Sequence, residues 1–307
     1  MRTDADGRTW IDDIPLDVWY DDPLLVFSSN SQATPANGPA APFATGAGQP
    51  MPRPAAGETP AASAPADPPA AGQPSVDWQE LISAEVLDAE AKALRNQLTA
   101  ALQTVATYNN GFQAIQWDGA TLCALAGVAI EHPEPLSWKD KAPYVRDLAQ
   151  KIEEAAQERG RTAFQETQAP FEQLVSVFSG NVPAGIEPPE ATVPFVESAS
   201  RGGLMRRMQA AQDWLTKNIN SADRLTSSEH KDRILHEASV LAALTKVISA
   251  EGYDAADEPD YAREADEIVK HSVNARSAAQ AGSYDAFRDA VDRIGTHCNN
   301  CHTNFRD

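Results

Sequence analysis

The sequence has few cysteines, few basic residues and no long apolar run, and each shortage excludes a class of protein. Only three of its 307 residues are cysteine, which is too few for a disulfide framework. No stretch approaches the roughly 18 to 20 apolar residues of a membrane-spanning helix. Lysine and arginine number 25 against 44 aspartates and glutamates, a formal net charge of −19. Because such a chain is repelled by nucleic acid and by anionic lipid, we expect neither a nucleic-acid partner nor a membrane span.

The acidic excess lies mostly in the first two thirds of the chain. From Arg201 onward there are 14 basic and 17 acidic side chains, so the last third is nearly neutral. An acidic face is more often a solvated surface than a docking site. If the chain does dock through its charges, electrostatic attraction favours a partner with a basic face.

Two N-terminal segments differ in composition from the rest of the chain. Residues 1–30 are acidic and aromatic, with Trp10, Trp19 and Tyr20 interleaved with aspartates. This segment is too short to fold alone, and we expect it to dock on a domain of the same chain. Residues 31–75 consist almost entirely of Ala, Pro, Gly, Ser, Thr and Gln. They cannot bury enough apolar surface to offset the entropy of ordering, so we expect a disordered tether.

Helical periodicity begins near Trp78 and continues to the C-terminus. Four helices are predicted within residues 76–182 and four more within residues 198–307, on either side of a proline-rich break. The predicted helices are about Leu81–Ala114, Gly119–Ile130, Trp138–Glu158, Thr162–Phe178, Gly203–Ile219, Ser227–Ala250, Pro259–Gln280 and Ser283–Asn304. The sequence therefore predicts an all-α chain of two consecutive antiparallel four-helix bundles, preceded by a disordered Pro/Ala-rich linker.

The two sets of four helices resemble copies of one unit. Ala163-Phe164 and Ala286-Phe287 open the last helix of each set. The same offset pairs Phe171 with Ile294, Val175 with Cys298, Phe178 with Cys301 and Ser179 with His302. The first unit is then a degenerate repeat without haem ligands, its space filled by its own side chains. Two unrelated helical domains are the alternative.

A C-x-x-C-H motif, Cys298-Asn-Asn-Cys301-His302, lies near the end of the last predicted helix. In such a motif the two thiols attach to the vinyl groups of haem and the histidine ligates the iron. A redox dithiol and half of a zinc site are the alternatives. A zinc site needs two further ligands at suitable spacing, and the sequence has no second C-x-x-C and no H-x-x-x-H. The motif therefore predicts one covalently attached haem c.

The positions before the motif favour a haem enclosed by helices. Phe287, Val291, Ile294, Cys298 and Cys301 recur at intervals of four, three, four and three, which is one face of a helix. The two cysteines thus continue an apolar, inward-facing stripe. A surface zinc or redox motif is more often found on an exposed turn.

This arrangement resembles the cytochrome c′ and cytochrome c-556 family, in which the motif lies at the C-terminus of a four-helix bundle. The resemblance covers about residues 199–307 and includes Thr303-Asn304-Phe305-Arg306 after the motif. It implies that Arg306 lies near a haem propionate and that Val240–Leu244 belongs to the second helix of the bundle. It also implies a distal position on the first helix, where Met205 aligns as a candidate iron ligand opposite His302.

Other residues in the chain have ordinary explanations. Met208 is a second distal candidate, although either methionine also suits a helix core. Cys123, in an apolar stretch, is expected to be a buried and inert thiol. His230, His236 and His271 are expected to be ordinary partly exposed residues rather than distal ligands, although His236 could face the bundle interior. His297 falls off the apolar stripe, and His132 lies in a proline-flanked loop with no ligand partner nearby.

The sequence thus predicts a c-type cytochrome that transfers electrons through one haem to a redox partner protein. A module that binds nitric oxide or carbon monoxide, and a helical interaction scaffold, are the alternatives. No acid–base pair suited to a haem enzyme is evident, so we expect no enzymatic activity. Because bacterial haem attachment normally takes place outside the cytoplasm, we expect an exported, periplasmic protein whose signal peptide is absent from this numbering. The resemblance also implies that a homodimer is one expected form.

Overall fold

The computed structural model describes residues 2–3, 9–11, 14–15 and 76–305, and the chain separates into two compact units, Met1–Pro68 and Pro69–Asp307. In the first unit, three short strands pair antiparallel in the order β1-β2-β3. They are β1 (Arg2–Thr3), β2 (Thr9–Ile11) and β3 (Ile14–Pro15). The rest of the predicted docking segment, and the whole predicted tether at 31–75, lie outside the described residues.

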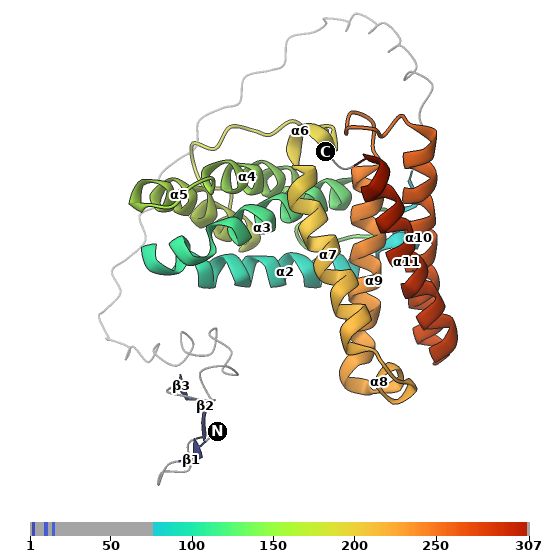
Figure 1. Cartoon of the computed structure of the whole chain (residues 1–307). Helices are drawn as coiled ribbons and strands as arrows, with labels where there is room; N and C mark the ends of the chain where they lie inside the picture. Colours follow the sequence, from blue (N-terminus) through green and yellow to red (C-terminus); the bar gives the residue numbers. More distant parts are fainter. Residues whose placement is uncertain (1, 4–8, 12–13, 16–75, 306–307) are drawn as a thin grey trace, which may run out of the picture. The chain divides into compact units, whose positions relative to one another are not determined.

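Residues 76–305 form helices joined by short connections, which confirms the all-α prediction for this part of the chain (Figure 1). The helices of the first half are α1 (Trp78–Leu81), α2 (Ala84–Ala101), α3 (Val105–Glu131), the 3₁₀-helix η2 (Lys139–Lys141), α4 (Ala142–Ala155) and α5 (Arg161–Phe178). Those that follow are α6 (Phe195–Ser198), α7 (Arg201–Asn218), α8 (Ala222–Thr226), α9 (Ser228–Ile248), α10 (Pro259–Gln280) and α11 (Tyr284–Phe305). Within the described residues, no helix has the length and apolar character needed to cross a membrane.

The predicted helix at 81–114 is wrong, because the chain breaks it after Ala101 and begins α3 at Val105. Thr104 caps α3: its hydroxyl accepts from the Thr107 N–H at 3.1 Å, and the Thr107 hydroxyl accepts from the Thr104 N–H at 3.0 Å. This reciprocal pair satisfies two donors that the new helix end leaves unpaired.

Gly119, the predicted start of the second helix, lies in the middle of α3 instead. A Cβ at this position would come within 2.9 Å of the Glu153 backbone nitrogen in α4. The glycine therefore lets α3 and α4 approach closely, and it does not interrupt the helix.

The two sets of helices belong to one compact unit. In the first set, α3 packs on α2 and α4, and α4 packs on α5; in the second, α9 packs on α7 and α10, and α10 packs on α11. Helix α3 also packs on α7, and α2 on α9, where the two sets cross (Figure 1). One apolar core extends from Trp78 to Ile294, while a second lies around Leu215, Ile234 and Phe287.

The predicted repeat agrees with the structure at some positions and not at others. Phe164 and Phe287 are both buried near the starts of α5 and α11. Phe178 makes an edge-on ring contact with Trp138 at 5.6 Å, so aromatic side chains fill this end of the first set. Val175, however, is 36% exposed, whereas its predicted counterpart Cys298 is partly buried.

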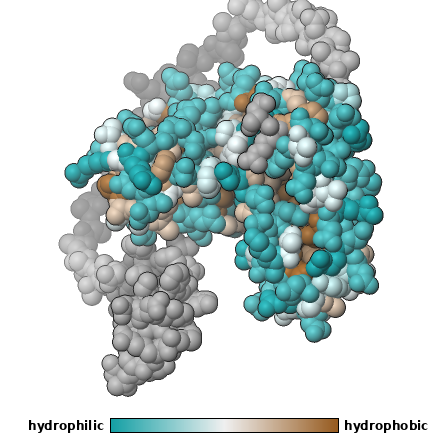
Figure 2. All heavy atoms as spheres, in the orientation of Figure 1, coloured by the Kyte–Doolittle hydropathy of each residue, from teal (hydrophilic) through white to brown (hydrophobic). Residues whose placement is uncertain are grey.

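The surface is mainly polar. On the face seen in Figure 2, hydrophilic residues cover most of both sets of helices, and only small apolar areas interrupt them.

Cys123 lies in the core, where its thiol donates to the Ser198 carbonyl at 2.7 Å and burial raises its pKa. The predicted burial of the Cys123 thiol is therefore confirmed.

Candidate functional site

The C-x-x-C-H motif occupies the last turns of α11, and the apolar stripe before it faces the core. Phe287, Val291 and Ile294 are buried, Cys301 is 7% exposed and Cys298 is partly buried. The spacing of four and three residues keeps these positions on one side of the helix. The stripe predicted from the sequence is thus an inward-facing stripe in the structure.

The motif and the two methionines of α7 line the same small cavity. Its volume is about 20 Å³, and helices α7, α9, α10 and α11 all contribute to its wall. The lining residues are Met205, Met208, Thr245, Ile248, Tyr261, Ala265, Ile268, Cys298, Cys301 and His302. Packing of the helices therefore brings the predicted proximal and distal positions to one place, although they are far apart in the sequence.

An open crevice of about 350 Å³ adjoins this cavity. Met205, Tyr261, Cys301 and His302 line both spaces, whereas Met208 lines only the cavity. The crevice is also lined by Arg201, Gly202, Arg206, Gln209 and Phe305. The ring of Phe305 makes an edge-on contact with that of Tyr261 at 5.6 Å. The enclosed part of the site is therefore apolar, and basic side chains appear only at its open side.

Arg201 is a site residue that the sequence analysis missed. It lines the crevice, and its guanidinium donates to the Asp254 carbonyl at 2.7 Å. The only sequence signal was its place at the start of the predicted first helix of the second set. Arg306, the residue predicted to lie near a propionate, lies outside the described residues.

Burial raises the pKa of both motif thiols. The pKa of Cys298 rises to about 11, and that of Cys301 rises as well. Redox-active C-x-x-C motifs have a lowered thiol pKa, so the shift is opposite to the one that a redox dithiol needs. Neither sulfur is in a disulfide.

The side chains of this site suit a c-type haem, whereas the cavity and the crevice have room for only part of one. Two thiols and an adjacent imidazole are the groups that attach haem c and ligate its iron, and the thioether of Met205 is a candidate second ligand in the same cavity. The cavity of about 20 Å³ cannot contain a porphyrin, and the crevice of about 350 Å³ is at the low end of small-molecule sites. A haem attached here would therefore need the crevice as well as the cavity.

A second, polar pocket of about 840 Å³ lies where α2, α3, α7 and α9 meet. Its floor holds Glu90, which bonds to Arg207 at 2.6 Å and to His236 at 2.5 Å. Burial alone would raise the pKa of Glu90, but the hydrogen bonds from His236 and Arg207 lower it to about 2. Burial and the charge of Glu90 raise the pKa of Asp118 to about 7. No sequence motif pointed to this network, because its members come from four different helices.

The histidines outside the motif do not line the cavity or the crevice beside the motif. His132 is fully buried, with Nε2 at 2.9 Å from the Ile82 carbonyl. His271 is only 8% exposed, so the expected partial exposure is wrong for His271. His230 stacks on Trp214, and His236 belongs to the Glu90 network. His271 and His297 stack on each other between α10 and α11.

Comparisons with protein-family models, with curated proteins and with solved structures gave no match to this chain. Its function is therefore inferred from the residues of the site alone.

Proposed function

We propose that this protein is a c-type cytochrome that carries one haem on Cys298, Cys301 and His302 and transfers electrons to a partner protein. The observation that supports it is the shared cavity: the motif at the end of α11 and Met205 of α7 line the same apolar space. A chance C-x-x-C-H would have no reason to share an apolar cavity with a methionine of another helix. The fold class and this placement are what the resemblance to the cytochrome c′ and c-556 family leads one to expect.

Each side chain has a definite part in this proposal. The thiols of Cys298 and Cys301 would hold the porphyrin through two thioether bonds to its vinyl groups. His302 would hold the iron, and Met205 would be its second protein ligand. Haem iron supplies one-electron chemistry, and an axial methionine raises its potential by favouring the ferrous state. Apolar Ile248 and Ile268 keep water from the enclosed side.

Met205 suits the distal position better than Met208 does. Met205 is half-buried and lines both the cavity and the crevice, so a haem that uses both spaces would meet its sulfur. Met208 is only 5% exposed and faces the cavity alone, as a core methionine does.

Basic groups at the open side suit the acidic edge of the porphyrin. Arg201 and Arg206 line the crevice, and guanidinium groups pair well with carboxylates such as haem propionates. We propose that Arg201, like Arg306, pairs with a haem propionate. The partner would be a redox protein met outside the cytoplasm, and a basic docking face on it would suit the net charge of −19.

The test is expression of the full chain in a host that attaches haem c. We expect the purified protein to be coloured, to carry the added mass of one haem, and to keep that mass after acid–acetone extraction. A variant with Cys298→Ala and Cys301→Ala should lose the covalent mass, whereas Cys123→Ala should keep it. Colourless wild-type protein of unmodified mass from such a host would refute the proposal.

Binding of a small gas is the second candidate, and the crevice beside Met205 favours it because it gives access from solvent. The ferrous spectrum with and without carbon monoxide separates the two functions. Sharp low-spin bands that do not respond to the gas support electron transfer. A broad high-spin spectrum that shifts with the gas supports gas binding.

A further inference from the structure

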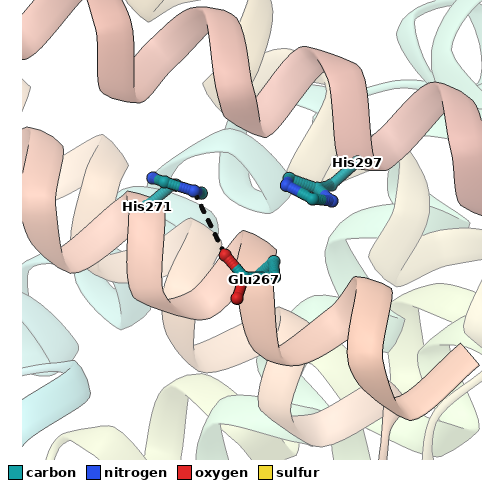
Figure 3. Close-up of side chains that lie close together, drawn as sticks. All are labelled: Glu267, His271 and His297. Atoms are coloured by element: carbon teal, nitrogen blue, oxygen red, sulfur yellow. Dashed lines mark ion pairs between the residues drawn. The ribbon is translucent and has the colours of Figure 1, made fainter. Parts of the chain in front are cut away.

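Two histidines and a glutamate meet on α10 and α11, away from the cavity and the crevice (Figure 3). Glu267 and His271 are four residues apart on α10 and therefore lie on the same face of the helix. His297 reaches toward them from α11, one residue before the C-x-x-C-H motif. One potential ligand atom from each of the three side chains lies within 4.8 Å of the others.

The tautomer of His297 is set by a neighbouring carboxylate. Its Nδ1 lies 2.8 Å from Glu264 Oε2, and Asn300 and Arg263 each hold Glu264 at 3.3 Å. With Nδ1–H donating to Glu264, the lone pair of His297 is on Nε2. An imidazole oriented through its second nitrogen by a carboxylate is the arrangement found around metal-bound histidines in proteins.

The rings of His271 and His297 lie nearly parallel, 5.7 Å apart with an interplanar angle of 15°. The Nε2 of His271 lies 3.3 Å from Glu267 Oε2. Two imidazoles and one carboxylate thus converge from two neighbouring helices; His271 is buried, whereas Glu267 and His297 are partly exposed.

The donor set selects the kind of ion. Calcium and magnesium prefer oxygen ligands throughout, whereas imidazole suits zinc and the later transition metals. Zinc bonds to histidine nitrogen and carboxylate oxygen at about 2.0–2.2 Å, so tetrahedral ligand atoms stand about 3.3 Å apart. Rotation of side chains on fixed helices can close the gap from the present separation of up to 4.8 Å.

An ion pair competes with the metal for Glu267. Lys270 Nζ lies 2.9 Å from Glu267 Oε1 and 2.8 Å from Oε2, and the lysine side chain is 59% exposed. Exposed pairs of this kind contribute little, typically less than about 1 kcal/mol. A divalent ion held by two imidazoles as well can therefore displace the ammonium group.

We propose that Glu267, His271 and His297 bind a divalent transition-metal ion of the zinc type, which cross-links α10 and α11 and leaves a coordination position open to solvent. Glu264 is the positioning residue for His297. This site is separate from the proposed haem site and does not depend on it. By linking the two helices, the ion would hold the helix that carries Cys298 and Cys301.

The experiment is isothermal titration of the chelator-treated full chain with ZnCl₂ at pH 7.5. Because Cys298, Cys301 and His302 could also take zinc when no haem is attached, the same titration is made on the chain with Cys298→Ser and Cys301→Ser. We expect one site that persists in this variant. His271→Gln and Glu267→Gln should weaken binding by about 10-fold to 100-fold, and Glu264→Gln by about 10-fold.

Two variants serve as controls for this site. His230→Gln removes a histidine outside the cluster and should leave zinc affinity unchanged. Lys270→Ala removes the competing ammonium group and should tighten binding severalfold. Zinc should also raise the Tm of the wild type but not that of His271→Gln. When both proteins are measured in chelator, their Tm values should be the same. Absence of zinc binding, or binding that the His271 and Glu267 variants leave unchanged, would overturn the proposal.

Discussion

The guanidinium of Arg207 in α7 donates to both carboxylate oxygens of Glu90 in α2, at 2.6 Å and 3.1 Å, across 117 residues of sequence. Its remaining nitrogen donates to Glu237 of α9 at 2.7 Å. The side chains of Glu90 and Glu237 are only 5% and 8% exposed. One arginine thus pairs with two buried carboxylates where the two sets of helices cross.

Arg207→Ala should destabilise the protein by about 3–5 kcal/mol, because two buried carboxylates lose the guanidinium that they share, which leaves Glu90 with His236 and Glu237 with the exposed Arg233. Urea unfolding at pH 7 measures the loss. Lys217→Ala is the matched control, since its ion pair with Asp213 is exposed and should be worth less than about 1 kcal/mol. Equal losses in the two variants would contradict the buried network.

Asp118→Asn should change the pH dependence of stability. Because burial raises the pKa of Asp118 from 3.8 to about 7, its folded form retains a proton that the unfolded chain releases. The wild type therefore loses stability as pH rises from about 4 to about 7, and the asparagine variant lacks this loss. We expect the variant to be about 1–3 kcal/mol more stable at pH 8 and equal to the wild type at pH 4. Denaturant unfolding across this range tests it, and a difference independent of pH would count against the shift.

Neighbouring glycines at the start of α7 should respond in opposite directions to alanine. A Cβ on Gly203 would stand 2.5 Å from the Ala120 Cβ of α3, whereas a Cβ on Gly202 would meet nothing within 4 Å. Gly203→Ala should cost about 1–3 kcal/mol through overpacking. Gly202→Ala should add up to about 1 kcal/mol through helix propensity. Thermal unfolding of the two variants tests the close approach of α3 and α7. Equal effects of the two substitutions on stability would contradict it.

Met205→Ala and Met208→Ala should differ in their haem spectra. If Met205 ligates the iron, its removal should convert a low-spin ferrous spectrum into a high-spin one that responds to carbon monoxide. Met208→Ala should remain low-spin, with only the loss of stability that a truncated core methionine causes. The reverse pattern would assign the distal position to Met208, and no change in either would leave both methionines as core residues.

Several helices follow directly from the sequence, and each error in the predicted helix ends has its own physical reason. Pro259–Gln280 was predicted and found with the same ends, because proline opens that helix and Gly282 closes the turn after it. The break at 102–104 was missed because no glycine or proline marks it and Thr104 caps through Thr107. Gly119 was taken for a boundary because the backbone of α4, which explains it, is 30 or more residues away.

The sequence by itself determined the helical class, the C-x-x-C-H motif and the inward stripe that leads to it, because these depend on spacings within a few turns of one helix. Only the tertiary structure decided which residues meet across helices. The cavity that Met205 shares with Cys301, the cluster of Glu267 and His271 with His297, and the ion pair of Arg207 with Glu90 each require a particular packing of helices. Periodicity fixes which side of a helix is buried, but the neighbour on that side depends on how far each helix is shifted and rotated against the next.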